Sequence, residues 1–254
     1  MAAILELKQI SVAFGGVAAL SRVDLAVEEG ELLALIGPNG SGKTTLLNAV
    51  SGQVRLAAGE IWYAGRRIDH LPAYQRSRLG IGRAFQQVNL FPGLSVAENL
   101  RLPVEARLGL GWRLWRGADR YPEVNRAVDG LVHEFGLDEK AGVAVGSLAH
   151  GEKRVLDVAM ALALRPRLLL LDEPTAGMAV EEVPHIAGLI RQVHAKTGIT
   201  IVVIEHRIDV VKALADRIVV LHDGHVLATG TPAAIMADKK VQEVYLGGLY
   251  AERD

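Results

Sequence analysis

The chain has 254 residues, of which 50% are hydrophobic and 22% charged, with a formal net charge of −1 and no cysteine. This composition excludes an intrinsically disordered chain, disulfides and thiolate metal sites, and it shows no global basic excess for binding nucleic acid. No apolar stretch reaches the length of a membrane-spanning helix, and the N-terminus lacks the pattern of a signal peptide. We therefore expect a cytosolic protein whose contact with a membrane is at most peripheral.

Two strands are predicted at the N-terminus, over residues 4–12 and 22–27, with a turn at residues 14–16 between them. The turn carries Phe14, for which the sequence leaves two interpretations open. The ring is part of the core, as aromatic side chains commonly are, or it stacks on a nucleotide base held by the glycine-rich loop that follows.

That loop is the motif around which the chain is organised: Gly37-Pro38-Asn39-Gly40-Ser41-Gly42-Lys43-Thr44, followed by Thr45. It fits the phosphate-binding pattern G-x-x-x-x-G-K-[ST], and it stands between a predicted buried strand (31–36) and a predicted helix (44–50). The glycines let backbone N–H groups converge on a phosphate, and the helix N-terminus favours an anion. Lys43 suits the β- and γ-phosphates, and the Thr44 hydroxyl suits Mg²⁺.

After the loop, residues 59–68 predict a small β-hairpin, and residues 79–85 a short strand that ends at Gln86-Gln87. A polar pair at the end of a parallel strand can face a ligand crevice, although a solvated glutamine explains Gln86 more simply.

The next stretch, about residues 95–165, has no convincing strand and is interpreted as a helical insertion in an α/β domain. Its segment Trp112 to Arg116 mixes tryptophan with arginine, which suits a nucleic-acid groove or a surface near anionic headgroups. An exposed helical excursion whose tryptophans cover a local core is the interpretation we favour. Residues 147–154 then open a helix that ends at Arg165-Pro166.

A second decisive stretch is Leu168 to Glu173, in which four leucines are followed by two carboxylates. The leucines predict a strand buried on both faces, and its carboxyl end is where doubly wound sheets bind ligands. Neighbouring side chains on a strand point in opposite directions, so the two acids have different roles. Asp172 suits Mg²⁺, and Glu173 suits activating a water, while helix capping by both acids is the alternative.

The last third of the chain predicts a helix that begins at residues 181–184 and a buried strand over residues 198–204 that ends at Glu205-His206. A lone histidine is usually structural, but the position of His206 at a strand end favours a place in the same crevice. Residues 218–227 predict a hairpin in which His222 and His225 are interpreted as turn residues rather than metal ligands. The tail, residues 231–254, predicts short helices.

With both motifs placed, the chain resembles the ATP-binding subunit of an ABC transporter over essentially its whole length. Residues 37–45 are similar to the family's Walker A loop, and residues 168–173 to its Walker B strand with a catalytic glutamate. By this resemblance Phe14 stacks on the base, Gln86 contacts Mg²⁺ and the lytic water, and His206 contacts the γ-phosphate.

The family signature, Leu-Ser-Gly-Gly-Gln, resembles Leu148-Ala149-His150-Gly151-Glu152, which would bind the nucleotide of an opposite subunit. Two residues depart from the family pattern. Ala149 replaces a serine whose hydroxyl would bond the γ-phosphate, and Ala179 stands where an aspartate is common. Each departure costs about 1 kcal/mol if nothing compensates for it.

The resemblance implies an α/β fold over residues 1–254 as a single ATP-binding domain: a RecA-like P-loop NTPase core, an antiparallel β subdomain, a helical subdomain at about 95–165 and a helical tail at about 231–254. The implied cofactors are ATP and Mg²⁺, with Mg²⁺ held by Thr44, Gln86 and Asp172, and the implied catalytic residues are Glu173, His206 and Gln86. The implied partners are a second ATP-binding subunit, transmembrane permease subunits and, indirectly, a solute-binding protein, with no nucleic acid. The implied location is the cytoplasmic face of the inner or plasma membrane.

Within the family, the segments Arg83-Ala84-Phe85-Gln86, Ile204-Glu205-His206 and Tyr245-Leu246-Gly247 resemble the branched-chain amino acid importers. Importers of urea or short amides, and the lipopolysaccharide-export ATPase, are alternatives within the family. A soluble ABC-type ATPase acting on DNA or ribosomes is an alternative of another class, but the chain lacks a long coiled-coil insertion and a second cassette. A nonhydrolysing module is supported only by Ala149 and Ala179.

Overall fold

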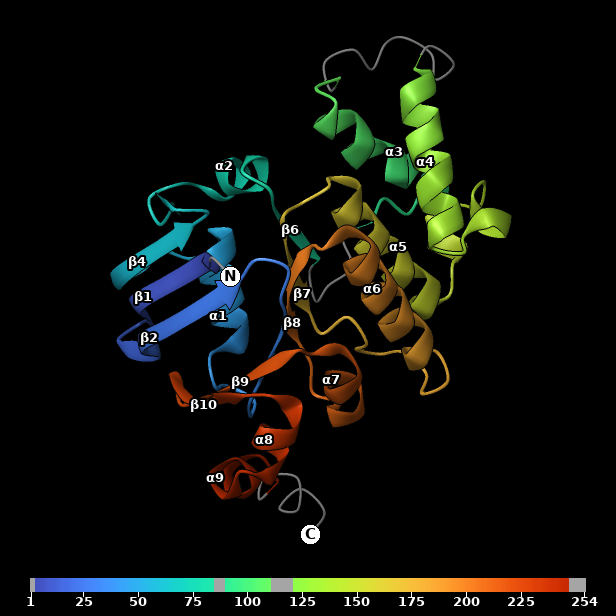
Figure 1. Ribbon diagram of the computed structural model, residues 1–254. Coiled ribbons are helices and arrows are strands. Elements are labelled where there is room, and N and C mark those ends of the chain that lie inside the picture. The colour runs from blue at the N-terminus through green and yellow to red at the C-terminus, as the bar shows by residue number, and fades with distance from the viewer. Residues whose placement is uncertain (1–2, 85–89, 111–120, 247–254) are drawn as a thin grey trace.

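The structure is a computed structural model that describes residues 3–84, 90–110 and 121–246. Two sheets form its framework (Figure 1). The four-stranded antiparallel sheet has the order β2-β1-β4-β5. Its strands are β1 (Ala3–Phe14), β2 (Val17–Glu28), β4 (Ala58–Tyr63) and β5 (Arg66–Arg67).

The six-stranded sheet has the order β10-β9-β3-β8-β7-β6, and all its neighbouring pairs are parallel except β10 with β9. Its strands are β3 (Leu32–Ile36), β6 (Ile81–Ala84), β7 (Leu168–Asp172), β8 (Thr200–Ile204), β9 (Arg217–His222) and β10 (His225–Gly230). The predicted α/β fold, with an antiparallel sheet beside a parallel one, is therefore confirmed.

The parallel sheet separates two hydrophobic cores, and its strands contribute to both. Leu168 and Leu170 pack in one core with α1 (Lys43–Ser51) and the antiparallel strands, whereas Leu169 and Leu171 pack in the other. Alternate side chains of a strand point to opposite faces, which is why a run of four leucines is buried on both sides. The helix α1 is thus enclosed between the two sheets (Figure 1).

Helices cover the other face of the parallel sheet and form its second core. They are α3 (Val96–Arg107), α4 (Pro122–Glu134), α5 (His150–Ala163), α6 (Val183–Thr197) and α7 (Ile208–Leu214). The first three pack together, because α3 contacts both α4 and α5. Among the described residues, none of the helices is both long and apolar enough to cross a membrane.

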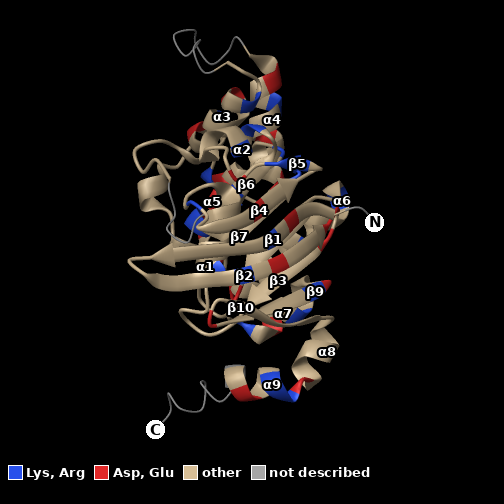
Figure 2. Ribbon diagram, turned by 90° about the vertical axis from the view of Figure 1, so that its left-hand side faces the viewer, with Lys and Arg blue, Asp and Glu red and all other residues tan. Residues whose placement is uncertain are grey.

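Shorter helices complete the described chain. The helix α2 (Ala73–Arg78) follows the antiparallel sheet, and the tail contains α8 (Pro232–Ala237), α9 (Lys239–Val241) and a π-helical turn (Gln242–Leu246). Thr231 begins α8 by accepting a hydrogen bond from the Ala234 amide at 3.3 Å. Figure 2 shows that basic and acidic residues are interspersed over the helices and strands of the molecule.

One helix start differs from the prediction. The structure begins α6 at Val183, so Glu181 and Glu182 precede the helix. Pro184 fits the first turn of a helix, where no amide hydrogen is needed. The Glu182 carboxylate instead accepts a hydrogen bond from the Ala179 amide at 3.1 Å and holds the preceding turn.

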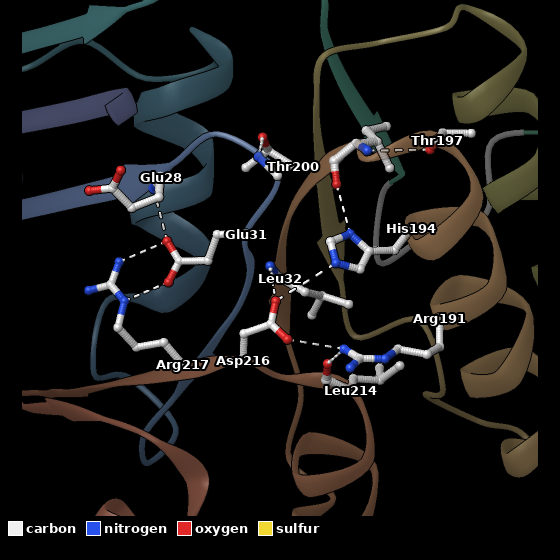
Figure 3. A network of polar contacts seen from close by, with 12 residues as sticks. Glu28, Glu31, Leu32, Arg191, His194, Thr197, Thr200, Leu214, Asp216 and Arg217 are labelled. Carbon is white, nitrogen blue, oxygen red and sulfur yellow. Dashed lines mark hydrogen bonds and ion pairs between the residues drawn. The ribbon is translucent and has the colours of Figure 1, made fainter. Parts of the chain in front are cut away.

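The amino ends of the central strands are joined by a polar network that spans distant parts of the sequence (Figure 3). Arg217 donates to both carboxylate oxygens of Glu31, at 2.6 and 3.0 Å, and Glu31 accepts from the Glu28 amide at 2.9 Å. Asp216 accepts from the Leu32 amide at 2.9 Å. This network clamps the end of the sheet away from the phosphate loop, which follows the carboxyl end of β3.

Candidate nucleotide site

The phosphate loop connects the carboxyl end of β3 to α1, as predicted. Gly42 is the N-cap of α1, with a φ of 101° that places it in the left-handed region. A Cβ on Gly37 would lie 2.1 Å from the Leu221 carbonyl oxygen, and one on Gly42 would lie 2.6 Å from the Ala19 carbonyl oxygen. Both positions therefore require glycine because neighbouring backbone approaches too closely for any side chain.

The outer part of the loop is open. A Cβ on Gly40 would meet no heavy atom within 4 Å, so this stretch leaves space for a ligand. The Lys43 ammonium is buried and donates to the carbonyl oxygens of Gly37 and Pro38, at 2.8 and 2.9 Å. Burial lowers the pKa of Lys43, whereas the nearby Glu173 and Asp172 carboxylates raise it.

Ser41 provides independent support for an anion at this loop. Its hydroxyl oxygen is buried and has no hydrogen-bond partner among the described residues. Buried polar atoms nearly always have a partner, so an orphaned hydroxyl in a glycine-rich loop fits a bound phosphate oxygen. The loop amides, Lys43 and Ser41 thus form a cradle whose chemistry suits phosphates.

Asp172 ends β7 beside this cradle. Its Oδ1 lies 3.5 Å from the Thr44 hydroxyl oxygen, and its side chain is nearly fully buried. Burial raises the pKa of Asp172, and the neighbouring Glu173 adds to this effect, while Arg83 opposes it. A buried carboxylate paired with a threonine hydroxyl is an oxygen donor set of the kind that holds Mg²⁺ on a nucleotide.

Glu173 follows Asp172 directly and points to a different partner. Its Oε1 lies 2.9 Å from Nε2 of His206, which comes from the end of the adjacent strand β8. Glu173 has a φ of 52°, in the left-handed region that is unusual for a residue with a side chain. The packing around it maintains this conformation, and both side chains remain partly open to solvent.

Three residues that support this site received no role from the sequence. Arg154, on α5, donates to the Glu173 and Pro174 carbonyl oxygens at 2.6 and 3.2 Å. Glu205 accepts from the Thr175 amide and hydroxyl at 3.1 and 2.7 Å. Arg83 is bound to Asp172. The alternation along β8 was the available signal for Glu205, since it must point away from His206.

The signature residues lie at the start of α5. Ala149 is the N-cap residue, and its amide donates to the Glu152 carboxylate at 2.9 Å. His150 places Nε2 3.3 Å from the Ala176 carbonyl oxygen. The same nitrogen would lie 2.8 Å from a Cβ on Gly177. The signature therefore contacts the loop that follows Glu173 in the same chain, while Leu148 is buried and Gly151 faces the Glu182 carboxylate.

The structure describes some, but not all, of the other residues that the sequence analysis singled out. Phe14 ends β1 with 52% of its surface exposed, which disfavours a core role and leaves the ring accessible. His222 and His225 both contact the turn residue Asp223, at 3.4 and 2.8 Å. Gln86, Gln87 and the Trp112–Arg116 segment lie outside the described residues.

Comparisons with known proteins agree with this geometry. A family profile described as "ABC transporter" matches residues 20–176. A second one, described as "Branched-chain amino acid ATP-binding cassette transporter", matches residues 225–251. The chain is 36% identical over 251 residues to the high-affinity branched-chain amino acid transport ATP-binding protein BraF of Pseudomonas aeruginosa, covering 96% of this chain and 98% of BraF.

Solved structures are similar over nearly the whole chain. One is the ADP conformation of MJ1267, an ATP-binding cassette of an ABC transporter, with a TM-score of 0.83 and 27% identity over 97% of this chain and 100% of that chain. Another is the dimeric post-hydrolysis state of the cassette MJ0796 bound to ADP and Pi, with a TM-score of 0.77 and 28% identity over 90% of this chain and 98% of that chain. The chain therefore belongs to the ABC transporter family, as an ATP-binding subunit of its branched-chain amino acid transport branch.

Proposed function

We propose that this subunit hydrolyses ATP with Glu173 as general base and His206 as its partner, and that hydrolysis drives import of branched-chain or other hydrophobic amino acids. The observation that carries this proposal is the 2.9 Å contact between Glu173 and His206 beside the phosphate cradle. A carboxylate at hydrogen-bond distance from a histidine, at the edge where the phosphate loop opens, is placed to accept a proton from an attacking water.

The roles of the other residues follow from their positions. Lys43 and the loop amides neutralise the phosphates, and the Ser41 hydroxyl gains a partner when a phosphate is bound. Thr44 and Asp172 would hold Mg²⁺, and Gln86 is proposed as a third residue at the ion. When bound, Mg²⁺ stabilises the charge that develops on the phosphate oxygens. Phe14 is proposed to stack on the adenine base with its exposed ring.

The proposed assembly is a head-to-tail pair of ATP-binding subunits attached to permease subunits at the cytoplasmic face of the membrane. Residues 148–152 of each subunit would complete the nucleotide site of the other, and a solute-binding protein would act on the outer side. The dimer described for MJ0796 supports this arrangement. Within the single domain 1–254, the segment at about 95–165 is proposed as the helical subdomain that passes nucleotide-driven motion to the permease.

Replacement of the proposed base tests the chemistry. We expect Glu173→Gln to retain ATP binding and to lower steady-state hydrolysis by roughly 10²–10⁴-fold, because the amide cannot accept the proton from water. The exposed Glu181→Gln is the matched control and should keep wild-type turnover. Phosphate release and equilibrium binding of ATP are measured on the same preparations. Retention of most activity in Glu173→Gln would remove the assigned role.

The cargo is tested in cells that lack the gene, by uptake of labelled leucine, urea and a short amide. Selective loss of leucine uptake, restored by the wild-type gene and not by Glu173→Gln, is the expected result. Loss of urea or amide uptake with intact leucine uptake would assign another cargo to the same ATPase.

A further inference from the structure

Arg83 is a buried cation next to the proposed Mg²⁺ residues, and the mechanism above gives it no role. Its side chain is 7% exposed, and that of Asp172 is 1% exposed. One guanidinium nitrogen, Nη2, donates to Oδ2 of Asp172 at 3.1 Å. A second, Nη1, donates to the Ser51 hydroxyl at 2.7 Å.

The sheet register explains how residues so distant in sequence meet. Strand β6 pairs in parallel with β7 so that Arg83 lies opposite Leu170. Asp172 is two residues beyond Leu170 and therefore projects to the same face of the sheet. That face packs on α1, and Ser51 is the last residue of α1. Arg83 therefore contacts both Asp172, at the end of the neighbouring strand, and Ser51, at the end of the helix that begins at the phosphate loop.

The two oxygens of Asp172 consequently have different partners. Oδ2 is held by Arg83, while Oδ1 is on the side of the Thr44 hydroxyl, 3.5 Å away. A guanidinium is a rigid planar fork, so its contacts with Ser51 and Asp172 restrict the rotation of the carboxylate. The orientation of Asp172 is therefore determined by Arg83 before any ion is bound.

We propose that Arg83 is a positioning residue, which presents Oδ1 of Asp172 and the Thr44 hydroxyl together to the Mg²⁺ of the bound nucleotide. The proposal rests on the function proposed above. Side chains that orient metal ligands without touching the metal commonly contribute 10–100-fold to metal affinity. Lysine carries the same charge as arginine but cannot donate from two fixed nitrogens to Ser51 and Asp172 at once.

The experiment compares Arg83→Lys with Arg76→Lys. Arg76 is also buried and contacts α1, but its partners are backbone carbonyl oxygens, those of Ala49 and Val50 among them. A fluorescent ATP analogue is titrated with and without Mg²⁺ on each full-length protein. The Mg²⁺ concentration for half-maximal tight binding is measured, and Mn²⁺ binding to the nucleotide complex is followed by electron paramagnetic resonance.

We expect Arg83→Lys to raise the half-maximal Mg²⁺ concentration roughly 10-fold and to change the Mn²⁺ spectrum, while nucleotide binding without metal stays within about twofold of wild type. Arg76→Lys should lower thermal stability and leave the Mg²⁺ dependence unchanged. Ser51→Ala, which removes the second anchor of Arg83, should shift the Mg²⁺ dependence in the same direction by a smaller factor. The Ser51→Ala variant tests the proposal even if Arg83→Lys does not fold.

An unchanged Mg²⁺ dependence in Arg83→Lys and Ser51→Ala would overturn the proposal, and so would an equal shift in Arg76→Lys. A different outcome would count against the proposed function itself: a wild-type protein that binds the ATP analogue with no dependence on Mg²⁺. The wild-type titration therefore separates the two failures.

Discussion

Asp157 is a buried carboxylate on α5, the helix whose start carries the signature residues. Its Oδ2 lies 3.7 Å from Nη1 of Arg154, which is also buried, and has no hydrogen-bond partner among the described residues. Burial raises the pKa of Asp157 to about 6, although the neighbouring Arg154 lowers it. The same Arg154 holds the carbonyl oxygens of Glu173 and Pro174, so this pair supports the loop that contains the proposed base.

This raised pKa predicts a pH-dependent stability. The folded protein binds the proton of Asp157 more tightly than the unfolded chain does, so the stabilisation is complete below pH 4 and is lost as the pH rises through about 6. Relative to Asp157→Asn, the free energy of unfolding of the wild type should therefore fall by on the order of 1–3 kcal/mol between pH 4.5 and 7.5, a span set by ~1.4 kcal/mol per pKa unit. Urea unfolding across this range measures the difference.

The exposed Asp129→Asn serves as the control for this measurement, because it changes the same functional group away from the core. A difference between wild type and Asp157→Asn that is constant with pH would show that Asp157 does not titrate in this window.

At the scale of the elements, the parallel sheet has a structural end and a functional end. The clamp of Glu31, Arg217 and Asp216 joins the amino ends of β3 and β9 to neighbouring segments (Figure 3). The phosphate loop, Asp172 and His206 all lie at the carboxyl ends of strands. Parallel strands place their carboxyl ends at one edge, which is why the site residues meet there.

Removal of the clamp should therefore affect stability and leave ligand binding intact. Glu31→Ala removes two contacts from Arg217 and the acceptor of the Glu28 amide, so we expect a loss of roughly 1.5–3 kcal/mol in the free energy of unfolding. The exposed pair of Arg167 and Glu29 lies near the same end, with side chains 55% and 54% exposed. Glu29→Ala should cost less than about 1 kcal/mol.

Denaturant unfolding and ATP binding are measured for both variants. A loss of ATP affinity in Glu31→Ala under conditions where it is fully folded would contradict this division of the sheet into two ends.

At the scale of the whole molecule, the proposed head-to-tail pair would place the start of α5 at the nucleotide site of the partner subunit. In that pair, the start of α5 would offer the partner its backbone amides and His150, but Ala149 provides no hydroxyl. Ala149 also leaves α5 without a side-chain acceptor at its N-cap, where serine is favoured.

Ala149→Ser is thus expected to have two separable effects. A serine N-cap should raise the free energy of unfolding by about 0.5–2 kcal/mol without nucleotide. In the Glu173→Gln background, it should also lower the ATP concentration at which half of the protein is dimeric, by roughly fivefold for a hydrogen bond of about 1 kcal/mol. Light scattering during size-exclusion chromatography measures the dimer.

Greater stability with an unchanged ATP dependence of dimerisation would mean that the residue acts only as a helix cap. If Glu173→Gln remains monomeric at every ATP concentration, this chain requires a different ATP-binding subunit as its partner.

The sequence by itself determined the motifs whose chemistry is local. Residues 37–45 form their loop because the glycines and the flanking strand and helix are adjacent in the chain, and residues 168–173 form a strand buried on both faces because four leucines alternate across it. The family, the α/β fold and the placement of Glu173 and His206 at one sheet edge could be predicted from these patterns, whereas their contact could not. The start of α6 was misplaced by two residues, since acids before a proline suit either a turn or a first helical turn.

Only the tertiary structure decided which side chains support those motifs. Arg83 and Asp172 are 89 residues apart, and their contact depends on the register between β6 and β7. The contacts of Glu205 with Thr175 and of Arg154 with Glu173 likewise depend on how strands and helices pack. Local patterns report which face of an element is apolar, but they do not report which buried charge on one element meets which partner on another. The partner of each buried charge is determined by the sheet register and by the packing of the two cores, which form together.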